Sequence, residues 1–407
     1  MNRRGFRAKR IVTCDERRAG GPLGVIEDGA IVIDDGAIAF VGRASDAPTD
    51  APLVDIGDAV ITPGLVDAHT HACWVGSRHA EYGVRMAGGD YGAIQAAGGG
   101  ILASSRAVAA ATERDLGQAL AERLARMAAL GVTTVEVKSG YGLEPDHEKK
   151  QLRAIAHAAG QAELPFIVPT YLALHALPLS ARENRAGYVA TVADVVLPDI
   201  AKAGLARFVD VYVDENAFDL REARTVAQAA VRLGLGLRMH VGQFKDVGGA
   251  ELCAELGGAS ADHLEHISDE GIAKLAAAGT HAVLLPVASF TLRQAPPPIA
   301  KLRKAGVPLV VASDANPGTA PTESLPLAMA LAVRLYGLSP VEALLGATRL
   351  AARSLALSDR GMLCVGARAD LVLWDLPHEE AIVQPWGVSR AREVIRDGVT
   401  IAGEPSR

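Results

Sequence analysis

Eight short apolar segments, separated by stretches with helical spacing of apolar residues, constrain the fold of this chain most strongly. Each has the length and composition of a buried strand, and they end at residues 67–69, 135–138, 171–175, 211–214, 237–240, 261–263, 283–286 and 310–314. Strands that alternate with helices form a parallel sheet, because each connection crosses back over the sheet. The eight segments predict a (β/α)8 TIM barrel, with an open doubly wound sheet as the alternative.

The polar residues at the strand ends favour the barrel. Most of the predicted strands end in His or Asp, among them His69, His175, His240, His263 and Asp314. In a closed barrel the C-terminal ends of all strands meet at one mouth, where barrel enzymes assemble their sites. These side chains are therefore expected to lie close together.

The two ends of the chain predict a smaller unit made of strands. Asp34-Asp35-Gly36 near the start and Asp397-Gly398 near the end are typical hairpin turns between short apolar runs. We therefore predict two domains. They are a composite β-sandwich from residues 1–62 and 365–407, and a catalytic barrel from residues 63–364.

Charge and cysteine content exclude several classes of function. The chain has 407 residues and a formal net charge of −6, without a basic run of five residues, which argues against nucleic acid as a partner. No apolar run is long enough for a membrane span or a signal peptide. The cysteines lie far apart and form no C-x-x-C pair, which argues against a zinc ribbon or a disulfide framework; they are Cys14, Cys73, Cys253 and Cys364. We expect a cytoplasmic protein with a small-molecule substrate.

His69 and His71 are the first candidates for metal ligands. Two residues at positions i and i+2 of a strand project to the same side, and an H-x-H pair alone is a weak signal. Adding His240 and Asp314 gives three imidazoles and one carboxylate, which is typical of a catalytic site with an open position. Zn²⁺ and Fe²⁺ both suit these ligands, so we predict one divalent metal of either kind.

Such a metal would favour hydrolysis. It lowers the pKa of a water molecule and polarises the carbonyl group that the water attacks. Asp314 is the candidate for moving the proton from the water to the leaving nitrogen. His263 is the candidate for a hydrogen bond to the water or to the developing oxyanion. Both are predicted to be catalytic.

Several motifs resemble the amidohydrolase superfamily, and within it the imidazolonepropionase family. The stretch Pro63 to His71 resembles the superfamily, whereas the family resemblance rests on four further segments. These are Gly98-Gly99-Gly100-Ile101, Val137 to Leu143, Ser260 to Leu264 and Ser313 to Thr319. The resemblance covers nearly the whole chain. It implies hydrolysis of the cyclic amide 4-imidazolone-5-propanoate to N-formimino-L-glutamate in histidine degradation.

The resemblance also implies substrate-binding residues. Arg78 would bind the propionate, as guanidinium groups bind carboxylates in a bidentate manner. Gln243 would hydrogen-bond the imidazolone ring. The remaining residues that the resemblance implies as contacts are Tyr141, His175, Asn316, Gly318 and Thr319. Relatives are often dimers, which leaves a homodimer open.

Some positions depart from the family. Binuclear relatives carry a carboxylated lysine on the fourth strand, but this chain has none there, which favours one metal; Lys138 on the second strand is interpreted as a structural or surface cation. His240-Val241-Gly242-Gln243 places an amide where relatives often have an acid, and residues 173–175 and 285–287 also differ. The alternatives are an amidohydrolase or deaminase with another cyclic substrate, and a scaffold without catalysis.

Overall fold

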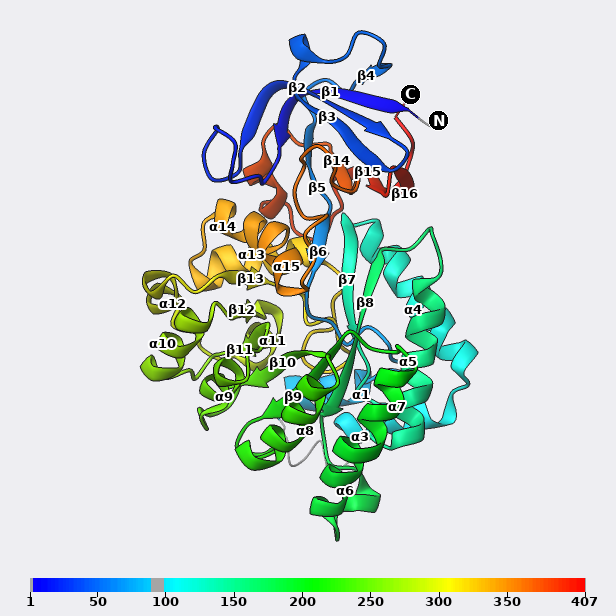
Figure 1. Ribbon diagram of the computed structural model, residues 1–407, viewed down its shortest axis with the longest axis vertical. Coiled ribbons are helices and arrows are strands. Elements are labelled where there is room, and N and C mark those ends of the chain that lie inside the picture. Colours follow the sequence, from blue (N-terminus) through cyan, green and yellow to red (C-terminus); the bar gives the residue numbers. More distant parts are fainter. Residues whose placement is uncertain (1–2, 89–98, 407) are drawn as a thin grey trace.

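The computed structural model describes residues 3–88 and 99–406. Expectations that involve Met1, Asn2, Gly98 and Arg407 lie outside the described residues. Two sheets organise the rest of the chain, one of them surrounded by helices and the other formed by the two ends of the chain (Figure 1).

One of the two sheets is parallel and has the order β13-β12-β11-β10-β9-β8-β7-β6. Its strands are β6 (Leu65–Asp67), β7 (Val132–Lys138), β8 (Phe166–Leu174), β9 (Phe208–Val213), β10 (Gly236–Val241), β11 (Ser260–His263), β12 (His281–Leu284) and β13 (Leu309–Val311). These are the eight strands that the sequence predicts. Several end two or three residues earlier than predicted, because Pro286 starts a helix and Asp314 has a positive φ of 55°.

Backbone contacts just beyond β6 and β13 close the sheet into a barrel. Thr70 and Ala315 form a parallel bridge, in which the His71 amide donates to the Ala315 carbonyl oxygen at 3.0 Å. The Asp314 amide donates to the carbonyl oxygen of His69 at 3.1 Å. The predicted closed barrel is therefore confirmed, and the open sheet is wrong.

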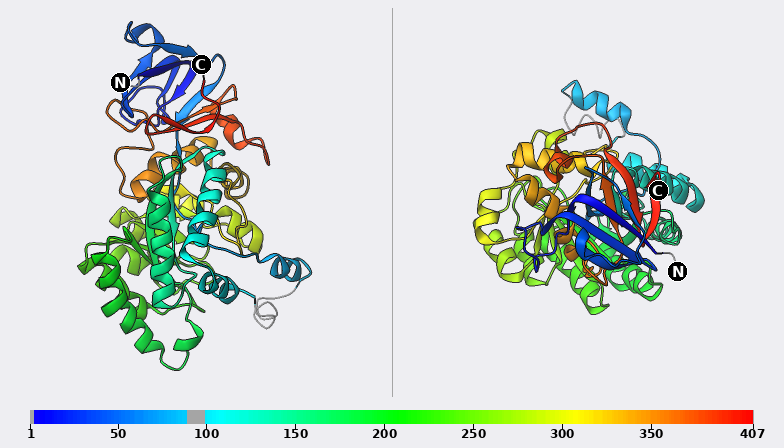
Figure 2. Two further views of the ribbon diagram at one scale, coloured as in Figure 1. Left: turned by 90° about the vertical axis from the view of Figure 1, so that its right-hand side faces the viewer. Right: turned by 90° about the horizontal axis from the view of Figure 1, so that it is seen from above.

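Helices surround the barrel (Figure 2). Among them, α4 shows why: Leu116, Leu120, Leu124 and Met127 recur at helical spacing and are fully buried, and Thr112 caps the first turn. The helices of the described residues are α1 (His79–Met86), α3 (Ile101–Ala110), α4 (Glu113–Ala128), α5 (Pro145–Ala159), α6 (Arg185–Thr191), α7 (Leu197–Lys202), α8 (Leu220–Arg232), α9 (Gly249–Glu255), α10 (Asp269–Ala278), α11 (Pro286–Leu292), α12 (Ile299–Ala305), α13 (Leu325–Tyr336), α14 (Pro340–Gly346) and α15 (Arg349–Ser354). None of the helices described is long and apolar enough to cross a membrane.

Both ends of the chain form the second sheet, of order β16-β15-β14-β5-β1-β2-β3 with β4 beside β1. The two predicted hairpins are present, with Asp35, Gly36, Asp397 and Gly398 all at positive φ as a tight hairpin turn requires. The strands are β1 (Arg4–Val12), β2 (Val25–Asp34), β3 (Ala37–Arg43), β4 (Leu53–Asp55), β5 (Val60–Pro63), β14 (Leu371–Trp374), β15 (Ala391–Arg396) and β16 (Val399–Gly403). We call this unit the terminal sheet.

The terminal sheet lies at the N-terminal ends of the barrel strands (Figure 1). β5 ends at Pro63 and β6 begins at Leu65, so the chain passes from one sheet directly into the other. The Trp374 ring lies against Gly131, immediately before β7, where a Cβ atom would be only 2.7 Å from the ring. The opposite, C-terminal ends of the barrel strands stay open for a site. The domain boundaries at residues 62/63 and 364/365 stay predictions.

Candidate metal centre and substrate pocket

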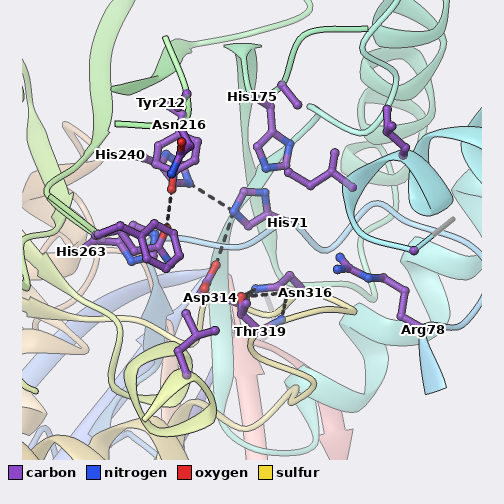
Figure 3. A pocket seen from close by; sticks show the side chains of 18 of the residues that line it. His71, Arg78, His175, Tyr212, Asn216, His240, His263, Asp314, Asn316 and Thr319 are labelled. Atoms are coloured by element: carbon purple, nitrogen blue, oxygen red, sulfur yellow. Dashed lines mark hydrogen bonds and ion pairs between the residues drawn. The ribbon is translucent and has the colours of Figure 1, made fainter. Parts of the chain in front are cut away.

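Three imidazoles meet at the C-terminal end of the barrel, and Figure 3 shows two of them, those of His71 and His240. His69 and His71 follow β6, and His240 lies in β10. One ring nitrogen from each of the three lies within 4.8 Å of the others, and the Nε2 atoms of His71 and His240 are 3.3 Å apart. Two ligands that share a metal at about 2.0 Å lie about 3.3 Å apart along a tetrahedral edge. The spacing therefore suits a common cation.

Carboxylates hold two of these rings at Nδ1, the nitrogen that points away from the other histidines. His69 Nδ1 is 2.6 Å from Asp262 Oδ2, and His240 Nδ1 is 2.9 Å from Asp210 Oδ1. A carboxylate at Nδ1 holds the proton there and leaves Nε2 as the lone-pair donor, as in many histidine ligands of metals. His69 Nε2 is buried and has no hydrogen-bond partner among the described residues. An orphaned buried nitrogen of this kind fits a metal ligand.

Asp314 brings a carboxylate to the same point from the loop after β13. Its Oδ1 lies 3.6 Å from His69 Nε2 and 3.4 Å from His71 Nε2. Burial raises the pKa of Asp314, although nearby His263 and His240 oppose this shift. The structure thus brings together the four side chains that the sequence predicts as metal ligands.

Burial also keeps the imidazoles neutral. Desolvation lowers the pKa of His71 to about 3 and that of His240 to about 4, and it lowers the pKa of His69 well below its usual value. Lys138 reinforces all three shifts through its positive charge. Neutral imidazole is the form that binds metals. The donor set is therefore in the protonation state that a cation needs.

A charged network lies beneath the histidines. Lys138 Nζ is 2.8 Å from Glu136 Oε1 and 2.7 Å from Asp210 Oδ2, and all three side chains are fully buried. Glu136 Oε2 accepts from the Thr70 amide at 3.0 Å. Burial by itself would lower the pKa of Lys138, but Asp210 and Glu136 outweigh it and the pKa is raised. Lys138 is therefore a structural cation, and its interpretation as a surface cation is wrong.

His263, the last residue of β11, lines the cavity above the histidines together with Asp314. Its ring centroid lies 5.4 Å from that of His240 and 6.0 Å from that of His69. Its Nδ1 lies 3.8 Å from Glu265 Oε2, which is too far for a hydrogen bond. The ring therefore reaches the site without belonging to the histidine triad.

The cavity has a volume of about 920 Å³ and opens from the histidines toward solvent. Its size falls within the range of small-molecule sites. The predicted contact residues that line it are Arg78, Tyr141, His175, Gln243, Asn316 and Thr319. Gly318 lies beside Arg78, so close that a Cβ atom would be 2.4 Å from Nη1. All seven predicted contact residues thus gather at one place.

Glu81 occupies one edge of the Arg78 guanidinium. Nε and Nη2 of Arg78 donate to the two carboxylate oxygens of Glu81, at 2.8 and 2.5 Å. Arg78 is largely buried, unlike a surface arginine. Among the described residues, Nη1 donates to no acceptor. This pairing, between residues three apart on one helical turn, was not part of the sequence prediction.

Asn316 organises the loop after β13. Its Oδ1 accepts from the amides of Gly318 at 2.8 Å and Thr319 at 2.7 Å, while its Nδ2 donates to the Asp314 carbonyl oxygen at 2.7 Å. Its amide group is thus engaged within the loop that carries Asp314. Gln243 differs, because its Oε1 accepts from the Tyr212 hydroxyl at 2.9 Å and the residue lines the cavity.

Sequence reasoning missed the residues behind the predicted ligands. Asp210 stands in an otherwise apolar strand and Asp262 in a fully buried one, and an acidic residue at such a position signals a buried partner. It also missed the cations farther out in the cavity, which are Arg85, Arg182, Arg185 and Arg293. Arginines in loops and short helices carry no such signal, because their usual place is the surface.

Comparisons with known proteins agree with this geometry. The model of the amidohydrolase family matches residues 60–404. A protein named imidazolonepropionase from Paracoccus denitrificans is 45% identical over 372 residues, which cover 90% of this chain and 92% of that protein. Another of that name, from Caulobacter vibrioides, is 44% identical over 382 residues, with 93% of this chain and 94% of that protein covered.

Solved structures share the fold at low sequence identity. A triazine hydrolase variant superimposes with a TM-score of 0.73 and 17% identity, covering 99% of this chain and 95% of that chain. Atrazine chlorohydrolase from Arthrobacter aurescens TC1, complexed with zinc, superimposes with a TM-score of 0.66 and 18% identity, covering 98% of this chain and 95% of that chain. The sequence matches extend over more than nine-tenths of the curated relatives. The chain belongs to the amidohydrolase family and, within it, to the imidazolonepropionase family.

Proposed function

We propose that this chain hydrolyses 4-imidazolone-5-propanoate to N-formimino-L-glutamate. The observation that carries the proposal is that His71 and His240, on which His69 converges, line the same cavity as Arg78. A hydrolytic centre and a carboxylate-binding group within one pocket suit a cyclic amide with an acidic side chain. The relatives named imidazolonepropionase support this substrate.

We propose one divalent metal, Zn²⁺ or Fe²⁺, held by His69, His71, His240 and Asp314. The orphaned Nε2 of His69 and the 3.3 Å separation of the two neighbouring Nε2 atoms support these ligands. When bound, the metal supplies a Lewis acid for the ring carbonyl and lowers the pKa of water. The ammonium of Lys138 lies between the carboxylates of Glu136 and Asp210. Because this cation already pairs with both carboxylates, they are not needed as ligands of a second metal, which supports a single metal.

The substrate's propionate would meet the Nη1 side of Arg78. Glu81 already uses Nε and Nη2, so it fixes the direction in which the remaining N–H groups point. The amino group of Gln243 would donate to the imidazolone ring, because Tyr212 already donates to its oxygen. Tyr141 and His175, whose rings lie 5.4 Å apart, would flank the substrate.

Asp314 and His263 would move protons and stabilise charge. Hydrolysis adds water across the ring C–N bond, so a proton has to pass from the attacking water to the leaving nitrogen. Asp314 is the acid–base candidate, because its buried carboxylate has a raised pKa and Gln243 is an amide. His263 would donate a hydrogen bond to the oxygen of the attacked carbonyl as negative charge develops there.

We propose that the enzyme acts in the cytoplasm and forms a homodimer. The four cysteines are free thiols in the structure, as a reducing compartment would keep them. Light scattering of the purified protein tests the dimer, and a monomer at micromolar concentration would contradict it.

The direct test follows the loss of imidazolone ultraviolet absorbance, with substrate freshly generated from urocanate. Metal-loaded and chelator-stripped protein are compared side by side, and the product is identified by mass. We expect turnover only with metal, with formation of N-formimino-L-glutamate. Absence of turnover by protein that contains a full equivalent of metal would overturn the substrate assignment.

A further inference from the structure

Two buried polar atoms face each other beside the proposed reaction centre. His263 Nδ1 and Glu265 Oε2 are 3.8 Å apart, and their side chains are 3% and 1% exposed. Neither atom has a hydrogen-bond partner among the residues that the structure describes. Catalytic hydrogen bonds are often long in the absence of substrate and tighten when it binds. The two atoms are therefore candidate partners for a hydrogen bond with each other.

The other oxygen of Glu265 is already engaged. Ser289 Oγ, on α11, lies 2.5 Å from Glu265 Oε1, and the Tyr336 hydroxyl, on α13, lies 2.5 Å from Ser289 Oγ. Ser289 and Tyr336 are buried as well. A row of four side chains therefore runs from Tyr336 through Ser289 and Glu265 to His263 at the cavity.

Donors and acceptors along this row can be matched in one direction. The Tyr336 hydroxyl donates to Ser289 Oγ, and Ser289 donates to Glu265 Oε1. If Glu265 is a neutral acid with its proton on Oε2, His263 Nδ1 can accept that proton in a hydrogen bond. Nδ1 is then the acceptor of the imidazole, and the ring proton is on Nε2. Every group in the row is uncharged in this arrangement, which suits their burial.

The electrostatic surroundings support neutral groups. Burial raises the pKa of Glu265 to about 8, and the nearby Asp314 and Asp214 act in the same direction, against the hydrogen bond from Ser289. Burial lowers the pKa of His263 to about 3. Neutral Glu265 beside neutral His263 is therefore the favoured state at pH 7.

The backbone between His263 and Glu265 has an uncommon conformation. His263 and Leu264 have positive φ angles of 81° and 73°, although neither is glycine. The Leu264 amide donates to the Val241 carbonyl oxygen at 3.1 Å and the His266 amide to that of Gly242 at 2.8 Å, which ties this turn to the end of β10. The turn brings the Glu265 side chain back beside the imidazole. Strain of this kind persists where the surroundings enforce it, often at functional sites.

We propose that Glu265 is a positioning residue that, as a neutral acid, donates a hydrogen bond to His263 Nδ1 and so keeps the His263 proton on Nε2, directed at the substrate. This inference rests on the proposed function, in which His263 donates to the carbonyl oxygen. It assigns Glu265 no contact with substrate. Ser289 and Tyr336 hold Glu265 in the orientation that makes the donation possible.

Two substitutions separate this role from its alternatives. Glu265→Gln keeps a donor for Nδ1 and an acceptor for Ser289, so it mimics the neutral acid. Glu265→Leu has a side chain of similar size that can neither donate to His263 Nδ1 nor accept from Ser289. We expect kcat of the Gln variant to stay within about threefold of the unchanged enzyme. We expect the Leu variant to lose about 100-fold in kcat, as when one oxyanion donor is removed, with little change in KM.

The tautomer of His263 is measured directly by ¹⁵N NMR of the zinc-loaded protein labelled at histidine, with His263→Asn to assign the signals. We expect protonated Nε2 and unprotonated Nδ1 in the unchanged protein and in Glu265→Gln. A protonated Nδ1 in either protein would overturn the proposal. So would a Gln variant as impaired as the Leu variant, or a Leu variant with full activity.

The spectra do not depend on turnover, so they decide the tautomer even if the proposed substrate is wrong. If Glu265→Leu does not fold, the proposal is still tested by the spectra of the unchanged protein and by the activity and spectra of Glu265→Gln. A Gln variant that is active and has the expected tautomer supports the proposal, whereas one that folds but has lost activity contradicts it.

Discussion

The charges beneath the histidines and the charges around the cavity mouth are arranged differently. Lys138 is fully buried between two carboxylates at 2.8 and 2.7 Å. Arg182 and Arg293 line the outer cavity, are exposed, and have no ion-pair partner among the described residues. Arg78 and Arg85 stand between these extremes, because both share Glu81. Arg185, also in the outer cavity, pairs with Glu222 at 2.6 Å, so the contrast with the metal centre rests on Arg182 and Arg293.

The difference indicates that the buried charges position the metal centre, whereas the outer charges attract an anion. A buried charge without a partner costs several kcal/mol, so the network beneath the histidines has to be matched atom by atom. Such a network adds little to stability but fixes positions, here those of His240 through Asp210 and of Thr70 through Glu136. Arg182 and Arg293 keep their water and remain available to an anion that arrives from solvent.

The largest effect is expected for Asp314→Asn. The substitution removes a proposed metal ligand and the proton carrier together, so kcat should fall by about 1,000-fold or more. Asp146→Asn, at a side chain that is 93% exposed, is the matched control and should change nothing. Steady-state kinetics with metal analysis check this. A variant that retained a tenth of the activity would remove Asp314 from the proton transfer.

Lys138→Met tests whether the buried network positions the metal centre. Removing the cation leaves Glu136 and Asp210 facing each other, which should lower the free energy of unfolding by about 3–5 kcal/mol and weaken metal retention. Urea unfolding and titration with a competing chelator measure the two effects. Lys301→Met breaks the exposed pair with Asp269 and should cost less than about 0.5 kcal/mol. An equal loss of unfolding free energy in Lys138→Met and Lys301→Met would contradict the view that only the buried charges have to be matched.

Arg78→Ala should act on substrate binding. Loss of a hydrogen bond to the charged propionate is worth about 1.5–3 kcal/mol, so KM should rise about 10- to 100-fold with a smaller change in kcat. Arg153→Ala, which removes an exposed arginine paired with Glu113, is the control. An unchanged KM in Arg78→Ala would mean that the propionate is bound elsewhere.

The smallest effect is expected at the mouth. Replacing Arg182 and Arg293 with Gln should lower kcat/KM by about two- to fivefold at low salt, and the effect should vanish near 0.5 M salt because the attraction is screened. The matched double variant, Arg153→Gln with Arg224→Gln, changes the same charge away from the cavity. A loss that persists in high salt would indicate direct contact with substrate.

The fold was predictable because its signals are local. Each barrel strand is a short apolar run, and parallel strands bring their ends to one mouth, so His69, His240 and Asp314 could be grouped without the structure. The partners of these residues were not predictable in the same way. Whether Glu136 or Asp262 supports a ligand depends on which strands are neighbours and in what register, as in the pairing of His240 with Asp262 across β10 and β11. Similarly, the sequence contains Glu265, but only the geometry shows that its carboxyl turns back to His263.

The terminal sheet has a consequence for how the protein is made. β5, from the first sixty-three residues, pairs with β1 on one side and with β14 on the other, and β14 lies more than three hundred residues later. On the ribosome, the early strands therefore emerge with an unpaired edge that stays open until almost the whole chain has been synthesised. An open strand edge invites pairing with other chains. We expect premature termination before residue 371 to yield aggregates rather than an active barrel, even though every proposed ligand would already be present.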